Sequence, residues 1–233
     1  MTRPKSLVKK SETSRAKILE AALEVFQEHG FQSSTMAEIA AKAGVARGAA
    51  YYYFDSKDAI VMAFYERSQA EMAAETGKRL DSCNNLEQRL RTILALKFEY
   101  LAPHRKLLGA LSSHTDPHNP LSPFSAATEG IRKQDFSLFA RAIRESRINL
   151  PPGIEPYLPR LLWLYQLGLI LYWVYDDSPG QRRTEALFSK SLQIVLFFLR
   201  YSGFSMLGPL HRLTLGLLDA VYGPDSQGTG VKA

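Results

Sequence analysis

Apolar residues near the start of the chain recur at the spacing of an amphipathic helix. Between residues 18 and 26 they fall every three or four positions, which predicts a helix that begins with Thr13 or Ser14 as its cap. His29 is the expected last residue, because Gly30 follows it and glycine readily takes the left-handed conformation that ends a helix.

Two shorter helices are expected next along the chain. Ser34 or Thr35 caps the second helix, and a turn at residues 43–45, which contains a glycine, separates it from a third helix over residues 47–53. Two short helices joined by a glycine turn form a helix-turn-helix, whose second helix enters the major groove of DNA. The pattern of residues 13–60 therefore indicates a DNA-binding domain.

The rest of the chain shows helical spacing with breaks at proline and glycine. Further helices are expected over residues 56–76, 86–101, 106–111, 126–146, 156–175, 182–201 and 210–222. The prediction is an all-α chain with a basic flexible arm at 1–12, a three-helix helix-turn-helix domain at 13–60 and an antiparallel helical bundle at 61–222. Residues 223–233 are rich in glycine, serine and threonine and are expected to be a disordered tail.

Residues 161–175 are apolar apart from Gln166. As a helix they rise about 22 Å, less than the roughly 30 Å core of a bilayer, so they predict a helix buried in protein and not a membrane span. Because residues 187–199 are similarly apolar, and a helix apolar on every face needs cover on every side, we expect a homodimer through these last long helices. The residues assigned to its interface are Leu169, Tyr172, Trp173, Leu192, Val195, Leu196 and Leu199.

Composition narrows the class of protein further. The 233 residues are 45% hydrophobic and 22% charged, which describes a globular chain and excludes a disordered polyelectrolyte. A single cysteine, Cys83, excludes a disulfide framework and a cysteine-rich zinc module. The first ten residues are polar and basic and contain no apolar segment of a secretion signal, so a cytoplasmic location is expected.

The net charge of +6 does not identify a partner by itself. Residues 1–17 hold six basic residues and one acidic residue, whereas residues 18–60 hold three basic and six acidic residues. The basic arm either lies along DNA phosphates or is a solvated tail without a role.

The helix-turn-helix resembles the N-terminal domain of TetR-family transcriptional regulators over about residues 13–60. The matching positions are Thr35, Ile39, Ala40, Ala43, Gly44, Val45, Gly48, Tyr51, Tyr53, Phe54, Ser56, Lys57 and Ile60. The resemblance implies a DNA-binding regulator, more commonly a repressor, that binds a palindromic double-stranded operator as a homodimer. It also implies a C-terminal domain that dimerises and binds a small, apolar or aromatic effector, which releases the DNA.

The chemistry of the residue types and the resemblance together assign the DNA contacts. Arg47 can pair its guanidinium fork with guanine or bind a phosphate instead, and Lys57 is expected to bind a phosphate. The complete set is Thr35, Ala46, Arg47, Gly48, Ala49, Tyr51, Tyr52, Tyr53 and Lys57. Ala46, Ala49 and Ala50 depart from the family's usual residues. Ala46 predicts a weaker helix cap, Ala49 the loss of a hydroxyl contact with DNA, and Ala50 a smaller apolar side chain beneath the helix.

Aromatic residues of the C-terminal domain either line an effector pocket or fill the core and the interface. The residues assigned to a pocket are Phe98, Phe139, Trp163, Gln166, Gly168 and Tyr172. Gln166 and Gly168 are the clearest of these, because they place a polar group and a gap inside an apolar helix.

Evidence for catalysis is lacking in the sequence. His104, His114 and His118 with Asp116 are the nearest approach to a metal-ligand cluster, and a solvated loop explains most of them better. We expect no catalytic residues, no cofactor, no metal and no membrane partner. The alternative function is a helical small-molecule or lipid-binding protein in which the helix-turn-helix serves only as a scaffold.

Overall fold

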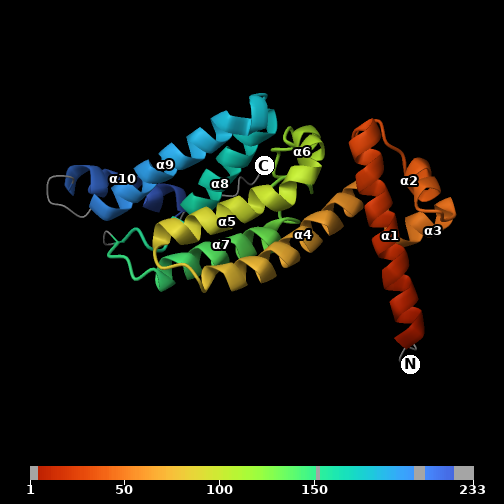
Figure 1. Cartoon of the computed structure of the whole chain (residues 1–233), viewed down its shortest axis with the longest axis horizontal. Coiled ribbons are helices and arrows are strands. Elements are labelled where there is room, and N and C mark those ends of the chain that lie inside the picture. The colour runs from red at the N-terminus through yellow and green to blue at the C-terminus, as the bar shows by residue number, and fades with distance from the viewer. Residues whose placement is uncertain (1–4, 151–152, 202–207, 223–233) are drawn as a thin grey trace, which may run out of the picture. The chain divides into compact units, whose positions relative to one another are not determined.

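Residues 5–150, 153–201 and 208–222 are described by a computed structural model, in which they form helices and turns with no strand in these ranges (Figure 1). The predicted all-α class is therefore confirmed. The tail predicted at 223–233 and the first four residues of the predicted arm lie outside the described residues. No helix within the described ranges is both long enough and apolar enough to cross a bilayer.

The chain folds as two compact units, each built from two separate stretches of sequence. The first unit comprises Met1–Glu75 and Lys97–Lys133, and the second comprises Thr76–Leu96 and Gln134–Ala233. Helices α4 (Lys57–Leu80), α5 (Leu86–Leu101) and α7 (Glu129–Glu145) each contribute residues to both units. The boundary expected at residue 60 coincides with no edge of these units, and it remains a prediction about functional domains.

The first unit contains several short elements. They are α2 (Met36–Lys42), α3 (Arg47–Tyr53), the 3-10 helix η1 (Ala102–His104) and α6 (Arg105–Leu111), which accompany the longer α1 (Lys5–His29). Ile18 and Phe26 of α1 and Ile39 of α2 are completely buried, so the apolar positions read from the sequence do form the core of this unit. Gly30 has a φ of 83°, the left-handed conformation expected at the end of α1.

The start of α1 differs from the prediction. The helix begins at Lys5, not after a cap at Thr13 or Ser14, so residues 5–12 are helical and do not belong to a separate arm. Lysine, serine and glutamate at these positions are compatible with a helix, and no glycine or proline follows Pro4 to break it. Because the first turns carry few apolar residues, helical periodicity alone did not reveal them.

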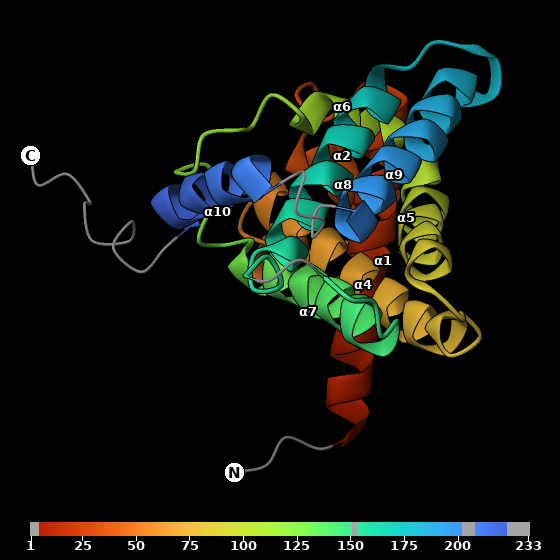
Figure 2. The same cartoon turned by 90° about the vertical axis from the view of Figure 1, so that its left-hand side faces the viewer.

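The second unit contains the apolar helices. They are α8 (Leu158–Tyr175), the 3-10 helix η2 (Pro179–Gln181), α9 (Arg182–Tyr201) and α10 (Gly208–Tyr222). Helices α8 and α9 lie side by side in Figure 1 and Figure 2 and contact each other. The core joins α4, α5, α7, α8 and α9 through Leu80, Leu86, Leu90, Ile93, Phe139, Ala142, Ile143, Leu158, Leu162, Trp163, Leu192 and Leu199.

Asp176 connects the end of α8 to the start of α9. Its carboxylate accepts hydrogen bonds from the Thr184 backbone nitrogen at 2.8 Å, the Thr184 hydroxyl at 2.7 Å and the Ser178 backbone nitrogen at 3.0 Å. Burial alone would raise the pKa of Asp176, but the hydrogen bonds from Ser178 and Thr184 outweigh it and hold the pKa well below its usual value. The folded state therefore favours the ionised form.

The stability of the α8–α9 turn is expected to depend on pH. Because the folded pKa of Asp176 is depressed, its contribution is fully present above about pH 4 and is lost as the pH falls through the folded value. We expect Asp176→Asn to lower the thermal unfolding temperature at neutral pH, and the difference from the unchanged protein to shrink below about pH 3. Circular dichroism melts across this pH range measure both quantities.

Asp177 provides the matched control for this substitution. Its side chain is exposed and pairs with Arg183 at 3.3 Å, so Asp177→Asn should change the unfolding temperature little. An Asp176→Asn deficit of equal size at neutral and acidic pH would contradict the role given to the carboxylate.

Candidate nucleic-acid interface and effector pocket

Helix α3 presents one polar face to solvent. Arg47, Tyr51 and Tyr52 are exposed, and Tyr52 keeps 70% of its surface. The Arg47 guanidinium lies 5.7 Å from the centre of the Tyr51 ring, and the Tyr52 and Tyr53 rings meet edge to face at 5.1 Å. The opposite face packs through Ala50, which is completely buried.

The remaining residues predicted on α3 lie around the same face. Ala46 and Gly48 are exposed, and Ala49 and Tyr53 are partly buried. Ala46 begins the helix without a side-chain cap, as predicted from its lack of a hydroxyl. Helix α3 therefore presents a cation from Arg47, hydroxyl groups from its tyrosines and, at Gly48, backbone without a side chain. A large ligand can reach this face of the unit.

Thr35 is exposed at the start of α2, but its hydroxyl has a partner within the unit. The Glu38 backbone nitrogen donates to Thr35 Oγ1 at 3.2 Å, and the Glu38 carboxylate accepts from the Thr35 backbone nitrogen at 2.7 Å, which forms a capping box. Hydrogen bonds from the Thr35 hydroxyl and backbone lower the pKa of Glu38. A phosphate bound at Thr35 would therefore lie beside an ionised carboxylate.

Lys57 has a structural role that the sequence did not reveal. Its ammonium donates to the backbone oxygens of Phe31 at 2.7 Å, Gln32 at 3.2 Å and Ser34 at 2.7 Å, and it lies 4.8 Å from the centre of the Phe31 ring. These three carbonyls occupy the three hydrogens of the ammonium. The phosphate contact predicted for this ammonium is therefore not available without breaking the clasp.

Ser56 caps α4. Its hydroxyl accepts a hydrogen bond from the Ala59 backbone nitrogen at 3.1 Å. Lys57 is the first residue of α4, so the clasp attaches this helix end to the connection between α1 and α2. No local pattern predicts this contact, because the carbonyls lie 23 to 26 positions away in the sequence.

The histidines considered as metal ligands are separated in the first unit. His104 packs edge to face against Phe64 at 4.6 Å, and burial and then the charge of Arg67 lower its pKa. His114 meets the edge of Phe31 at 6.4 Å, whereas His118 is exposed and pairs with Asp116. In the part of the chain that the structure describes, no three His, Cys, Asp or Glu side chains are grouped to hold a metal ion.

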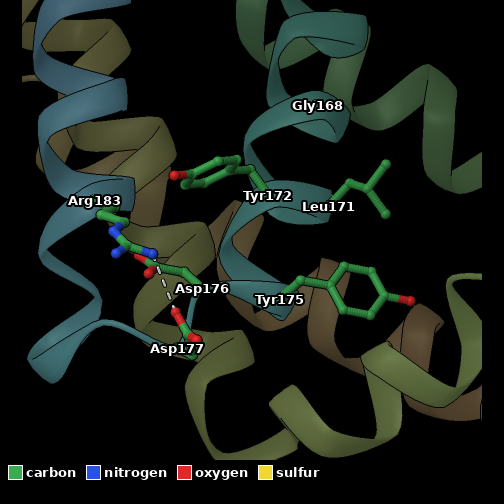
Figure 3. Close-up of a pocket in the computed structure, with 7 residues that line it drawn as sticks. All are labelled: Gly168, Leu171, Tyr172, Tyr175, Asp176, Asp177 and Arg183. Atoms are coloured by element: carbon green, nitrogen blue, oxygen red, sulfur yellow. Dashed lines mark hydrogen bonds and ion pairs between the residues drawn. The ribbon is translucent and has the colours of Figure 1, made fainter.

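A surface groove of about 510 Å³ lies where α8 ends and α9 begins (Figure 3). Its lining consists of Gly168, Leu171, Tyr172, Tyr175, Asp176, Asp177 and Arg183. Figure 3 shows Tyr172 projecting from α8 on the side of the Arg183–Asp177 pair, whereas Leu171 and Tyr175 project on the other side of the helix. An apolar wall with one ion pair at its edge suits an apolar group better than a strongly polar one.

The pocket predicted from the sequence is divided by the geometry of α8. Gly168 and Tyr172 line the groove, but Phe139, Trp163 and Gln166 are buried in the second unit and Phe98 belongs to the first unit. Residues two positions apart on a helix differ by about 200° in direction, so Gln166 and Gly168 cannot face the same space. The groove therefore contains two of the six residues, and an effector pocket formed by all six remains a prediction.

Gln166 makes a polar contact inside the apolar core. Only 1% of its surface is exposed, and its Nε2 donates to Asp135 Oδ2 of α7 at 3.0 Å. Within the described residues nothing donates a hydrogen bond to Gln166 Oε1. A buried acceptor without a partner costs about 1–3 kcal/mol of stability. This oxygen is therefore an exception to the rule that buried polar groups are hydrogen-bonded.

The predicted dimer face also needs correction. Leu169, Trp173, Leu192 and Leu199 are buried within a single chain, and Val195 and Leu196 pack against the same core. Of the predicted set, Tyr172 remains exposed. The apolar residues that α8 and α9 do expose are Leu171, Tyr172, Tyr175, Leu187, Ile194, Phe197, Phe198 and Tyr201, named here the outer apolar face.

Comparison with known protein families identifies both parts of the chain. The family described as bacterial regulatory proteins, tetR family, matches residues 18–64, and the tetracyclin repressor-like C-terminal domain matches residues 89–213. The second match alone covers more than half of the 233 residues.

Individual relatives agree with these families. The HTH-type transcriptional activator FasR of Mycolicibacterium smegmatis is 25% identical over 71% of this chain and 74% of its own length. The TetR-family transcriptional repressor FadR of Thermus thermophilus, solved in complex with lauroyl-CoA, is 26% identical with a TM-score of 0.57, over 78% of this chain and 93% of its own. FadR of Bacillus subtilis, in complex with stearoyl-CoA, has a TM-score of 0.59 at 19% identity, over 81% and 98% of the two chains.

The Lys57 clasp is expected to contribute to the stability of the first unit. Lys57→Met removes the charged donor and leaves the carbonyls of Phe31, Gln32 and Ser34 without it, so the free energy of unfolding should fall by about 1–3 kcal/mol. Urea unfolding followed by circular dichroism measures the loss. Lys17 is exposed on α1, and Lys17→Met should change stability by no more than about 0.5 kcal/mol. Unchanged stability in Lys57→Met, together with weaker binding to all DNA sequences, would restore the phosphate role.

Proposed function

Because the chain belongs to the TetR family of bacterial regulatory proteins and is a DNA-binding transcriptional regulator, not an enzyme, we propose that it binds a palindromic operator as a homodimer. A small, apolar or aromatic effector in the second unit releases the DNA. The observation that carries the proposal is the polar, exposed face of α3, with Arg47 beside tyrosines and Ala50 buried behind it.

Arg47 is the residue proposed to read a base. It is exposed at the first position of α3, where its fork can donate two hydrogen bonds to one guanine. Tyr51 and Tyr52 offer hydroxyls to phosphates, which set the register on DNA without reading sequence. Since Thr35 and Lys57 bond within the unit, the phosphate contacts proposed there pass to backbone groups at the starts of α2 and α4.

The outer apolar face is proposed to bind the same face of a second copy. Leu171 and Tyr175 on α8, with Ile194 and Phe197 on α9, each expose half or more of their surface, and soluble monomers rarely keep so many large apolar groups on two adjacent helices in water. A two-fold axis through this face gives the four-helix arrangement common in homodimers. The two α3 helices of such a dimer would meet successive major grooves, about 34–36 Å apart.

The effector is proposed to bind in the second unit and to act by linkage. An effector that favours one of two arrangements by about 1–3 kcal/mol changes operator affinity roughly 5- to 150-fold. The acyl-CoA ligand of the Thermus thermophilus relative supports an effector with a large apolar part. We propose that the regulator represses transcription, because release of DNA by a ligand needs only one state of the protein that binds the operator. The relative FasR, by contrast, is named an activator.

The alternative of a lipid-binding or small-molecule-binding scaffold draws its support from Ala46, Ala49 and Ala50. A scaffold would bind any DNA weakly and without preference for one palindrome. A regulator should select one palindrome from random duplexes and should lose affinity linearly with the logarithm of salt concentration. Selection followed by fluorescence anisotropy at several salt concentrations separates the two functions.

Arg47→Ala is expected to relax the choice of operator. Loss of one bidentate pair with guanine should weaken binding to the selected palindrome by about 1–3 kcal/mol and leave binding to random DNA nearly unchanged. Anisotropy titrations with both DNAs measure the ratio. Arg144 is exposed on α7 in the second unit, and Arg144→Ala serves as the matched control. An equal loss on both DNAs would show that Arg47 binds phosphate, and no loss on either would remove it from the interface.

Phe197→Glu is expected to dissociate the dimer. Phe197 is 57% exposed on the outer apolar face, where a buried charge in each copy would raise the dimer dissociation constant at least about tenfold. Sedimentation velocity over a range of concentrations measures this constant. Leu213→Glu makes the same change on exposed α10, outside the face, and should leave it unaltered. The opposite result would move the interface to α10.

A further inference from the structure

Positive and negative charge are separated along helix α1. Residues 5–17, named here the basic segment, hold five basic residues and one acidic residue. Residues 18–29 hold three glutamates and neither lysine nor arginine. The family match begins at residue 18, so the whole basic segment precedes the residues matched to the family. The basic segment is therefore a feature of this chain that the family assignment does not explain.

The acidic half of α1 is neutralised within the first unit. Lys42 of α2 pairs with Glu24 at 3.2 Å and with Glu28 at 2.8 Å. Arg67 of α4 pairs with Glu20. Each glutamate of this half thus has a cation beside it, and the three together do not offset the positive charge of the basic segment.

The basic segment lies outside the core of the unit. Figure 1 shows the start of α1 continuing beyond α2 and α3. Ile18 is the first buried side chain that the structure describes on α1, and Arg15 and Lys17 before it are exposed. Among the described side chains, no carboxylate forms an ion pair with Arg15 or Lys17. Their charge is therefore available to a partner.

Arg15 connects the basic segment to the face of α3 that is proposed to contact DNA. Its guanidinium lies 4.8 Å from the centre of the Phe54 ring, and Phe54 is the residue that ends α3. Tyr51 and Tyr52 are exposed in the last turn of the same helix. A duplex bound at α3 would thus pass beside Arg15 and the helix that leads away from it.

The charges of the basic segment also conflict with its helical structure. Its first turn contains no acidic residue, and Lys5 and Lys9 are four positions apart. Cations at the positive end of a helix dipole destabilise the helix, and so do like charges at this spacing. Phosphates beside the segment would reverse the first effect and screen the second. The segment is therefore better suited to a polyanion than to water.

We propose that the basic segment binds the phosphate backbone of DNA beside the groove that α3 enters. Its 13 residues are about 20 Å long, a length over which duplex DNA carries about twelve phosphate charges. A helix is about 10–12 Å across and cannot enter a minor groove about 6 Å wide, so the segment reads no base edges there. The inference rests on the proposed function, and it adds a sequence-independent part to the affinity for DNA.

The test removes charge from the basic segment of the full chain and keeps its helix propensity. Lys5→Gln, Lys9→Gln and Lys10→Gln are combined in one variant, because glutamine and lysine have similar helix propensities. Fluorescence anisotropy at several salt concentrations measures binding to a random duplex and to the selected palindrome. Loss of one phosphate contact from each copy of a dimer should reduce the slope of log affinity against log salt by about 2. The preference for the palindrome should not change.

A second variant and a matched control assign the effect to the segment. Arg15→Gln combined with Lys17→Gln removes the two exposed cations at the end of the segment nearest the core, and it should reduce the slope in the same way. Lys78→Gln, Lys133→Gln and Arg144→Gln together remove three positive charges from exposed positions of α4 and α7. This control should keep the slope of the unchanged protein.

Two outcomes overturn the proposal: an unchanged slope on both duplexes in the variant at residues 5, 9 and 10, or an equal reduction in the control. The first outcome, together with lost binding to vesicles that contain phosphatidylserine, would assign the segment to a membrane surface instead. Failure to select any palindrome would remove the proposed function. The random duplex would still decide whether the segment binds phosphates.

Discussion

Helix α8 is apolar on almost every face, and the second unit is organised by the need to cover it. One side is buried by the chain itself, through Leu162, Trp163 and Leu169 among others. The other side carries Leu171 and Tyr175, which a single chain leaves in water. Apolar area removed from water stabilises a protein by about 25 cal/mol per Å², so an uncovered face of this kind favours association. The groove and the outer apolar face both include residues of this helix.

In the first unit, contacts with neighbouring residues hold the short helices α2 and α3 in place. Helices α2 and α3 have seven residues each, too few to persist alone in water. Their geometry is therefore imposed by contacts with the rest of the unit: the capping box of Thr35 and Glu38, the burial of Ala50, and the Lys57 clasp on the connection before α2. The exposed position of Arg47 at the start of α3 is a consequence of these contacts and not of α3 itself.

Helix ends that depend on a glycine or a capping residue were predicted well from the sequence. Gly30 and the Thr35 cap placed the ends of α1 and α2, and the limits of α3 agree to the residue, because glycine conformation and capping act within one turn. The direction of side chains on α8 could not be predicted, since a helix without a polar stripe does not indicate which side faces the core. The contacts of Lys57 within the unit could not be predicted for a related reason: its carbonyl partners are distant in sequence, and only the folded unit brings them to its ammonium.

The two sides of α8 also separate two kinds of binding. Gln166 faces α7 inside the chain, while Tyr172 lies on the outer apolar face, so an effector bound inside the second unit and a second copy at Tyr172 would not compete for the same surface. Linkage requires this property, because an effector that displaced the partner would dissociate the dimer and could not shift it between two arrangements.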